Sequence, residues 1–393
     1  MTATAPSMDL GLQAGVNSAW MGSALGPDAV VAVAMSGGVD SSVAAALCTT
    51  AGIDTVGVTM RLWASEEMEQ QEGGCCSADA VEDARRVCSR LGIPHYVLNM
   101  RDHFQQTVVE DFLSQYGSGR TPNPCIRCNE KVKFAELLRR VEAVGATHIA
   151  TGHYARVTPD GTGGFQLRRG ADMRKDQSYT LYRCDQSLLR RTVLPLGGME
   201  KSQVRRLAGE LGFGVATKPD SQELCFVGGS DHRAVLAREL AGRFAEGPIE
   251  DLHGAVVGRH RGIPFYTVGQ RQGLGIAVTS PDAEPLYVVD VIPARNALVV
   301  GPWHALRSSG CNLSSCVYPE APPTAGDIAG HAQLRAHARV AAAVWHVLPG
   351  ARARVDFEEP QIGVAPGQSL VLYDGDRVVA GGEVVAVGSE GTV

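Results

Sequence analysis

Positive charge is missing from the start of this chain, whose first lysine or arginine is Arg61. Secretory and transit segments need basic residues near their beginning, so neither is expected. No apolar run reaches the roughly 20 residues of a membrane-spanning helix. The net charge of −6 excludes a generally basic nucleic-acid binder, so any polyanion site must be a local basic patch. These absences predict a cytoplasmic protein that does not enter membranes.

A length of 393 residues exceeds what one compact core usually holds, so two or three domains are expected. Residues 1–28 are rich in Ala, Ser and Gly and predict a flexible N-terminal extension with one short helix near 8–14. Residues 29–230 alternate strands and helices, which is typical of an α/β doubly wound parallel sheet. The expected strands are 29–35, 55–62, 95–99 and 148–151, and the expected helices are 41–50, 78–91, 103–116, 131–144 and 202–211.

The pattern changes after residue 230. A helix at 231–241 and short β segments at 255–257, 286–292 and 297–300 predict a small central α+β domain at 231–301. Short strands and Gly/Pro turns then recur over 302–393, which predicts a C-terminal antiparallel β-barrel. A hairpin is also expected at 157–170.

The segment at 30–42, VVAVAMSGGVDSS, joins a valine-rich strand to a helix through a loop of small residues. Adjacent glycines let the backbone approach an anion, and the free N–H groups of a helix start favour negative charge. The common NTPase loop requires a lysine, and this loop has none. SGGVDSS instead resembles the pyrophosphatase-type loop (PP-loop) of ATP-dependent adenylating enzymes. The alternative is an ordinary Gly–Ser turn.

Ten cysteines without a signal segment indicate a reducing compartment. Cys125 and Cys128 lie in TPNPCIRCN, surrounded by basic residues and close to a helix start, and both features stabilise thiolate. Cys225 lies in KPDSQELCF, which predicts a polar, exposed loop. Other cysteines, namely Cys48, Cys88 and Cys184, fall in regular helix or strand patterns and are expected to be buried and inert.

Alternatives for these cysteines remain open. A structural zinc site would need a second ligand pair beside the C-x-x-C motif. An iron–sulfur cluster held by Cys125, Cys128 and Cys225 would leave one iron open, and thiolates are its proper ligands. The pair Cys75-Cys76 could be redox-active, although Ser77 after it is better explained as a helix cap.

The order of several motifs carries a resemblance. SGGVDSS is followed by PNPC-x-x-CN-x-x-x-KF, ATGHYAR, KDQSY, SQELCF, TVGQRQGLGI and PGQS. Together these motifs, from about residue 30 to the C-terminus, resemble the bacterial tRNA-specific 2-thiouridylases. The resemblance implies that the protein is an enzyme, a tRNA-uridine 2-sulfurtransferase that replaces the C2 oxygen of wobble uridine 34 with sulfur in an ATP-dependent reaction. It also implies a cysteine desulfurase or a sulfur-relay protein as persulfide donor.

The resemblance also implies roles for individual residues of this chain. Cys128 and Cys225 would be the catalytic pair. ATP would contact Ala34, Met35, Ser36, Gly37, Gly38, Val39, Asp40, Ser41, Met60 and Gly152. The tRNA would contact Asn123, Pro124, Cys125, His153, Lys175, Asp176, Gln177, Arg335 and Gln368. The residue after Arg335 is Ala336, where relatives often have an aromatic residue, and Cys125 stands where some relatives have Asp.

The chemistry of the residues agrees with this reading. A uridine C2 oxygen is a poor leaving group until adenylation lets it leave with AMP. Asp40 could hold Mg²⁺ near the phosphates. Cys225 would then deliver sulfur as a persulfide, and Cys128 would act as an acid or displace the sulfur. The displacement route ends in a Cys128–Cys225 disulfide, which needs a reductant at each turnover.

Two basic clusters fit a local tRNA footprint. Residues 120–140 contain six Lys/Arg against two Glu, and residues 168–191 contain seven against three Asp. The alternative is scattered charge on solvated helices. His153 could likewise contact RNA or be a histidine at the edge of the core. Two other functions remain open, a different adenylating synthetase, such as an amidating one, and a tRNA-binding sulfur carrier.

Overall fold

The computed structural model describes residues 25–62, 77–219, 226, 232–276, 284–320 and 326–388. The chain forms two compact units. The first contains 1–107, 125–228 and 376–378, and the second contains 108–124, 229–375 and 379–393. The expected helix at 8–14 lies outside the described residues. The predicted domain boundaries remain a prediction.

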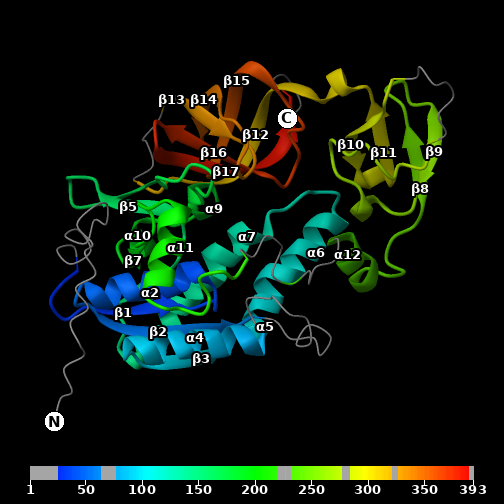
Figure 1. Ribbon diagram of the computed structural model, residues 1–393. Coiled ribbons are helices and arrows are strands. Elements are labelled where there is room, and N and C mark those ends of the chain that lie inside the picture. Colours follow the sequence, from blue (N-terminus) through cyan, green and yellow to red (C-terminus); the bar gives the residue numbers. More distant parts are fainter. Residues whose placement is uncertain are drawn as a thin grey trace, which may run out of the picture. The chain divides into compact units, whose positions relative to one another are not determined.

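The first unit is built on a parallel sheet, drawn in blue, cyan and green in Figure 1. Among the described residues it has five strands in the order β3-β2-β1-β4-β7. They are β1 (Val30–Ala34), β2 (Asp54–Arg61), β3 (His95–Asn99), β4 (His148–Ala150) and β7 (Thr192–Val193). Val31, Ala32 and Val33 are all fully buried, so both faces of the central strand are covered.

Helices connect these strands. They are α2 (Val39–Thr50), α4 (Ala78–Leu91), α5 (Arg101–Phe104), η1 (Gln105–Val109), α7 (Pro124–Arg127), η2 (Cys128–Glu136), α8 (Leu137–Val141), η3 (Glu142–Val144), α9 (Ser178–Leu181), α10 (Gln186–Leu189) and α11 (Lys201–Glu210). Helix α6 (Glu110–Gly117) belongs to the second unit. Helix α4 has its predicted bounds because Ser77 accepts the N–H of Ala80 and Gly92 ends the helix with φ +69°. The predicted hairpin is β5 (Ala155–Pro159) with β6 (Phe165–Arg169).

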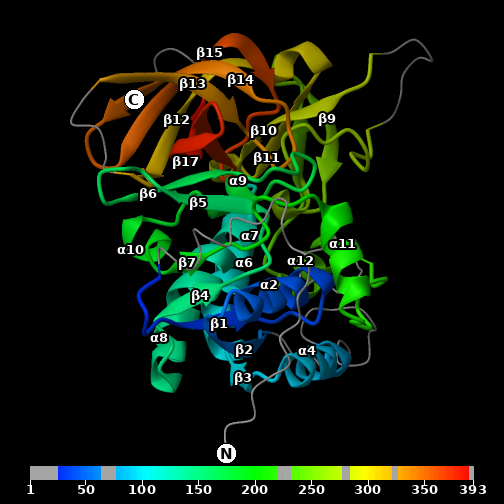
Figure 2. The ribbon, with the colours of Figure 1, turned by 60° about the vertical axis from the view of Figure 1, so that its left-hand side comes forward.

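One face of the sheet is covered by α2, α4 and α11, and Figures 1 and 2 both show α11 beside α2. Val43 of α2, Val87 of α4 and Val204 of α11 share one buried cluster with Val33 of β1. This packing fixes the position of the α2 N-terminus. The N-terminus lies within the SGGVDSS segment at 36–42, which is called the phosphate loop below.

The second unit contains α12 (His232–Glu239) and a mixed sheet of order β10-β11-β8-β9 in its described part. These strands are β8 (Gly247–Glu250), β9 (Val256–His260), β10 (Tyr287–Ile292) and β11 (Ala297–Gly301), with short helices η4 (Ile263–Phe265), η5 (Pro293–Arg295) and η6 (Trp303–Leu306).

The C-terminal part of the second unit is an antiparallel barrel around Trp345, which is fully buried. Six described strands form the barrel in the order β12-β15-β14-β13-β16-β17. Pairing of β12 with β17 closes it. They are β12 (Arg307–Val317), β13 (Asp327–Gln333), β14 (Ala341–Leu348), β15 (Arg352–Ile362), β16 (Ser369–Asp374) and β17 (Arg377–Val387). The predicted fold class is confirmed.

Candidate active site

The phosphate loop joins β1 to α2 at the carboxyl edge of the sheet. Gly37 has φ +69°, and a Cβ there would lie 2.6 Å from Cα of Ala80, so only glycine fits. Gly38 is the N-cap of α2 and provides no side-chain cap. The N–H groups of the first turn of α2 are therefore suited to an anion.

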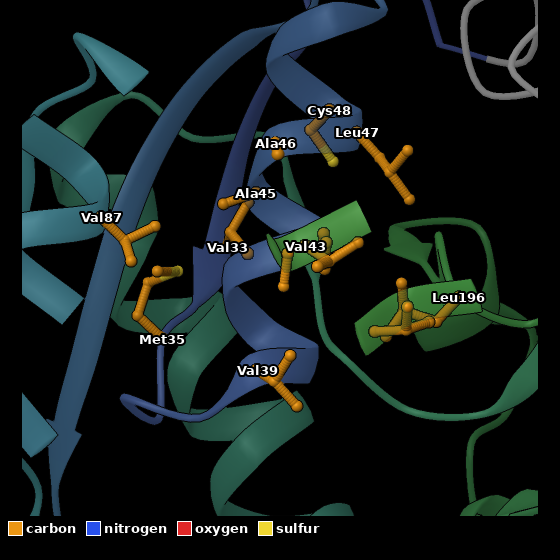
Figure 3. Packing of buried hydrophobic residues seen from close by; sticks show 14 of the residues in the cluster. Val33, Met35, Val39, Val43, Ala45, Ala46, Leu47, Cys48, Val87 and Leu196 are labelled. Atoms are coloured by element: carbon orange, nitrogen blue, oxygen red, sulfur yellow. The ribbon is translucent and has the colours of Figure 1, made fainter. Parts of the chain in front are cut away.

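Serine hydroxyls hold the shape of this loop. Oγ of Ser41 accepts the N–H of Ser36 at 3.1 Å and lies 3.2 Å from Oγ of Ser36. Oγ of Ser42 donates to the carbonyl of Gly38 at 2.8 Å. Met35 and Val39 point into the core beneath the loop, as Figure 3 shows. Their predicted contact with ATP would therefore be made by backbone atoms.

The segment 151–154 lies against the phosphate loop, as its position after β4 predicts. A Cβ on Gly152 would come within 2.9 Å of the backbone N of Ser41, so the two segments touch. The phenol of Tyr154 donates to Oδ1 of Asp40 at 2.7 Å. Met60 lies near the end of β2, at the same edge of the sheet.

Two lysines distant in sequence reach the lysine-free loop. Nζ of Lys201 lies 2.7 Å from both carboxylate oxygens of Asp40. Nζ of Lys218 lies 3.3 Å from the carbonyl oxygen of Gly37 and 3.0 Å from Oδ2 of Asp83. Sequence reasoning missed both residues, because no local motif marks a lysine 161 or 181 residues away.

Asp40 is the predicted magnesium ligand. Its carboxylate accepts two hydrogen bonds at Oδ1, from Tyr154 and Lys201, and one at Oδ2, from Lys201. A carboxylate has about four lone-pair positions. The three hydrogen bonds therefore leave one lone pair, on Oδ2. The carboxylate of Asp40 fits a single contact to Mg²⁺ through Oδ2 and does not fit bidentate binding.

The KDQSY segment, residues 175–179, links the phosphate loop to the helix that carries Cys125 and Cys128, which is called the cysteine helix below. Gln177 exchanges hydrogen bonds with Tyr154, through Oε1 at 3.0 Å and its N–H at 2.9 Å. The N–H of Thr180 donates to the carbonyl of Gln177. Nδ2 of Asn129, the residue after Cys128, donates to Oγ1 and O of Thr180 at 3.1 Å. Hydrogen bonds therefore connect Asp40 to the neighbour of Cys128.

Asp176 has a structural role in the same segment. It is buried, and its carboxylate binds Arg169 at 2.8 Å and the N–H groups of Gly170 and Ser178. This arrangement fixes the turn between Lys175 and Gln177. The tRNA contacts of these three residues remain a prediction.

The helix that carries the cysteines begins earlier than predicted. Helical structure runs from 124 to 144, whereas the expected helix began at residue 131. Pro124 starts it, because proline lacks an N–H and its φ suits the first helical position. Cys125 is exposed and Cys128 is buried, with Cys128 opening the π-helical stretch η2.

Cys225 lies outside the described residues, as do Cys75 and Cys76. Phe226, which follows Cys225, is buried, so the prediction of an exposed loop is wrong at this position. Its ring packs edge-on against Phe104 of α5 at 6.0 Å. Nε2 of the adjacent His103 lies 3.2 Å from the carbonyl of Lys131 in η2. Phe226 is therefore anchored on the helix next to the one that carries Cys128.

Much of the predicted basic footprint is paired. Glu130 forms ion pairs with Arg183 at 2.8 Å, Lys131 at 3.1 Å and Arg127 at 3.2 Å. Burial raises the pKa of Glu130, but these cations outweigh it and leave the pKa below its usual value. Glu136 likewise binds Arg139 and Arg140. These cations stabilise the cysteine helix, so the count of basic residues overstates the charge that the described residues offer to RNA.

His153 packs under the cysteine helix. Its Nδ1 lies 2.7 Å from Oγ1 of Thr151, and its ring lies 5.9 Å from that of Phe134. Burial, with a smaller effect of Lys133, lowers the pKa of His153 to about 3. The imidazole is therefore neutral at physiological pH.

Four predicted tRNA-binding residues lie in the second unit, namely Asn123, Pro124, Arg335 and Gln368. Arg335 is exposed, and its Nη2 donates to the carbonyl of Gly363 at 2.7 Å. Gln368 is half-buried, and within the described chain its Oε1 is enclosed without a hydrogen-bond partner. Asn123 and Pro124 directly precede Cys125.

The buried cysteines are as predicted. Burial raises the pKa of Cys48 to about 12 and that of Cys88 to about 11, and it also raises the pKa of Cys184. Three or more His, Cys, Asp or Glu side chains in metal-binding geometry are not found within the described ranges. Since Cys225 is outside those ranges, the cluster alternative stays open.

Comparison with known proteins identifies the family. The family described as "tRNA methyl transferase HUP domain" matches residues 29–229. The family described as "tRNA methyl transferase PRC-barrel domain" matches residues 233–302, and the family described as "Aminomethyltransferase beta-barrel domain" matches residues 308–384. The tRNA-specific 2-thiouridylase MnmA of Heliobacterium modesticaldum is 48% identical over 358 residues, 90% of this chain and 92% of the relative. That of Moorella thermoacetica is 47% identical over 90% of this chain and 99% of the relative.

The chain belongs to the tRNA-specific 2-thiouridylase family. Among solved structures, an NMN synthetase from Francisella tularensis is 17% identical with a TM-score of 0.32, and the alignment covers 56% of this chain and 82% of that one. This likeness is too distant to add to the family assignment. Where the structure describes the chain, no helix combines the length and apolar character of a membrane span.

Proposed function

We propose that this protein is a tRNA-uridine 2-sulfurtransferase that thiolates C2 of wobble uridine 34 with ATP. The observation that carries the proposal is the chain of contacts from Asp40 in the phosphate loop to Asn129 beside Cys128. These hydrogen bonds connect the loop proposed to bind ATP to the helix that carries Cys125 and Cys128. The names of the relatives point to the same reaction.

The residues divide the reaction between them. The phosphate loop, with Gly152 behind it, would bind ATP, and one oxygen of Asp40 would hold Mg²⁺, which supplies charge neutralisation at the phosphates. Adenylation of the C2 oxygen then makes AMP the leaving group. The proposed tRNA contacts in the first unit are Cys125, His153, Lys175, Asp176 and Gln177.

Sulfur transfer would use the cysteine pair. The terminal sulfur of a Cys225 persulfide attacks C2, and AMP leaves with the former C2 oxygen. Attack of the Cys128 thiolate on Sγ of Cys225 then releases 2-thiouridine and forms a Cys128–Cys225 disulfide, which a thiol reductant resets. The persulfide would come from a cysteine desulfurase or a relay protein. The anchoring of Phe226 beside the Cys128 helix supports this pairing.

Mass spectrometry of tRNA from cells that lack the protein tests the proposal. We expect 2-thiouridine at position 34 to disappear, to return with the parent chain, and to stay absent with Cys128→Ser or Cys225→Ser. ATP-dependent adenylating activity that persists in the Cys128→Ser/Cys225→Ser double variant, without thiolation, would instead favour another adenylating synthetase. Absence of tRNA-dependent pyrophosphate release would favour a sulfur carrier, and loss of a methyl group would favour a methyltransferase.

Cys125→Ser separates the two sulfur mechanisms. The persulfide route predicts that sulfur transfer continues in this variant, because the exposed Cys125 takes no covalent part, and that only the KM for tRNA changes. A cluster held by Cys125, Cys128 and Cys225 predicts loss of activity together with loss of visible absorbance in anaerobic preparations.

A further inference from the structure

The ammonium of Lys201 lies beside the first turn of α2. Lys201 opens α11, 161 residues after Asp40, and its Nζ is 2.7 Å from both oxygens of that carboxylate. Only 11% of the Lys201 side chain is exposed, against 33% for Asp40. Lysine is almost never buried unless it is paired. Helix α11 thus brings a buried positive charge to the residues that follow the glycine loop.

A carboxylate in this position opposes phosphate binding. Two unit negative charges about 5 Å apart repel by roughly 3 kcal/mol at an effective dielectric constant of about 20. The α2 dipole offsets only about 0.3–1 kcal/mol of this. In the common NTPase loop, a lysine within the motif reaches the phosphates. The present loop contains no lysine, so the compensating cation must come from elsewhere in the fold.

A purely structural ion pair between α2 and α11 is the competing explanation. The two helices already share the buried apolar cluster, to which α11 contributes Val204, Leu207 and Ala208. The ammonium lies outside this apolar contact, on the partly exposed Asp40. The ring of Tyr154 lies 5.7 Å from Nζ, so the cation is also held in place from a second side.

We infer that Lys201 is a phosphate-contacting residue of the nucleotide site, which supplies the positive charge that the loop sequence lacks. Before ATP binds, the ammonium neutralises Asp40. When ATP binds, the same ammonium faces the phosphates, while Asp40 is available to Mg²⁺ through Oδ2. This inference rests on the proposed use of ATP at this loop.

Calorimetric titration of the full chain with ATP and Mg²⁺ tests the inference. Lys201→Met should weaken ATP binding at least tenfold and slow tRNA-dependent pyrophosphate release at least as much, with unchanged affinity for tRNA alone. Lys201→Arg, which keeps the charge, should recover part of the affinity. Arg206→Met is the matched control, since Arg206 lies on the same helix, is exposed and pairs with Glu210. It should behave as the parent.

A second pair of variants covers the case in which Lys201→Met fails to fold. Asp40→Asn removes the charge that Lys201 neutralises, so it should bind magnesium-free ATP at least as tightly as the parent does. Asp40→Asn/Lys201→Met buries no unpaired charge and should still bind magnesium-free ATP at least tenfold more weakly than Asp40→Asn. A purely structural pair predicts equal affinity for these two variants.

Equal ATP affinity of Asp40→Asn and Asp40→Asn/Lys201→Met would overturn the inference and leave the proposed function standing. A Lys201→Met protein with a lowered Tm and an ATP Kd within twofold of the parent would do the same. A parent protein that neither binds ATP nor releases pyrophosphate would overturn the proposed function and the inference together.

Discussion

The phenol of Tyr154 donates a 2.7 Å hydrogen bond to Oδ1 of Asp40, 114 residues earlier in the chain. This bond joins the segment after β4 to the phosphate loop after β1. Because the backbone N–H and carbonyl of Tyr154 also exchange hydrogen bonds with Gln177, this residue links the loop to the segment that leads to the cysteine helix. The phosphate loop, proposed for adenylation, is therefore connected by hydrogen bonds to the cysteine helix, proposed for sulfur transfer.

Tyr154→Phe should lower the free energy of unfolding by about 1–2 kcal/mol, since it removes one hydrogen bond to a charged acceptor. Thiolation should fall because Asp40 is less well oriented. Urea denaturation and a single-turnover thiolation assay measure the two effects. Tyr96→Phe, at an exposed tyrosine, is the control and should change neither. Equal stability of Tyr154→Phe and the parent would contradict the prediction.

Gly152→Ala should weaken ATP binding at least tenfold. The added Cβ would lie 2.8 Å from the backbone C of Asp40 and 2.9 Å from N of Ser41, so the phosphate loop would have to move. Gly209→Ala is the control, because a Cβ there meets nothing within 4 Å and the position is helical. It should raise stability by about 0.5–1 kcal/mol and leave the ATP Kd unchanged.

The two loop glycines should respond differently to alanine. Gly37→Ala places a side chain at φ +69° against Ala80, so the protein should be destabilised by more than about 1 kcal/mol. Gly38→Ala has φ −102°, and its Cβ would make an ordinary van der Waals contact with Oγ of Ser36 at 3.5 Å, so the fold should be retained. ATP affinity should nevertheless fall about tenfold, because the methyl group occupies the approach to the helix start. Thermal unfolding and titration with ATP distinguish the two effects, and unfolded Gly38→Ala would refute the assignment.

Among the cysteines that the structure describes, iodoacetamide at pH 8 should alkylate Cys125 first, since its side chain is exposed. Cys48, Cys88 and Cys311 should react only after unfolding, because burial keeps them from the reagent and raises their pKa values to about 12, 11 and 12. Peptide mapping by mass spectrometry measures each rate. Modification of Cys48 as fast as Cys125 in the folded protein would show that this part of the core is open.

His153 should make the protein less stable in acid. The unfolded imidazole binds a proton below pH 6.5, whereas the folded one binds it only near pH 3. Between these values the unfolded state holds more protons, so the free energy of unfolding falls as the pH is lowered. His153→Gln should reduce the loss between pH 7 and pH 5 by about 1–2 kcal/mol in urea denaturation. The exposed His304 provides the control substitution, and an unchanged pH dependence in His153→Gln would show that the pKa of this imidazole is not lowered in the folded protein.

Several features of the fold could be predicted because they depend on neighbouring residues. The strand before SGGVDSS, the bounds of α4 between Ser77 and Gly92, and the order of sheet and barrel all follow from local hydrophobic pattern, capping and turns. The convergence of Gly152 on the phosphate loop could also be predicted, since strands of a parallel sheet end at one edge.

Other features could not be read from the sequence. The sequence pattern predicts the cysteine helix only from residue 131, because local pattern does not indicate that Pro124 occupies the first helical position. The burial of Phe226 depends on its contact with Phe104, a residue distant in sequence.

The sequence by itself determined the form of this loop and predicts that its backbone groups bind an anion, because glycines, serines and a helix start are local properties. Only the tertiary structure decided which charges surround it. Lys201, Lys218 and Tyr154 reach the loop from other elements, and no periodicity or motif indicates which distant side chain will be folded against Asp40. Ion pairs depend on separation in space, and that separation is set by how α11 packs on α2.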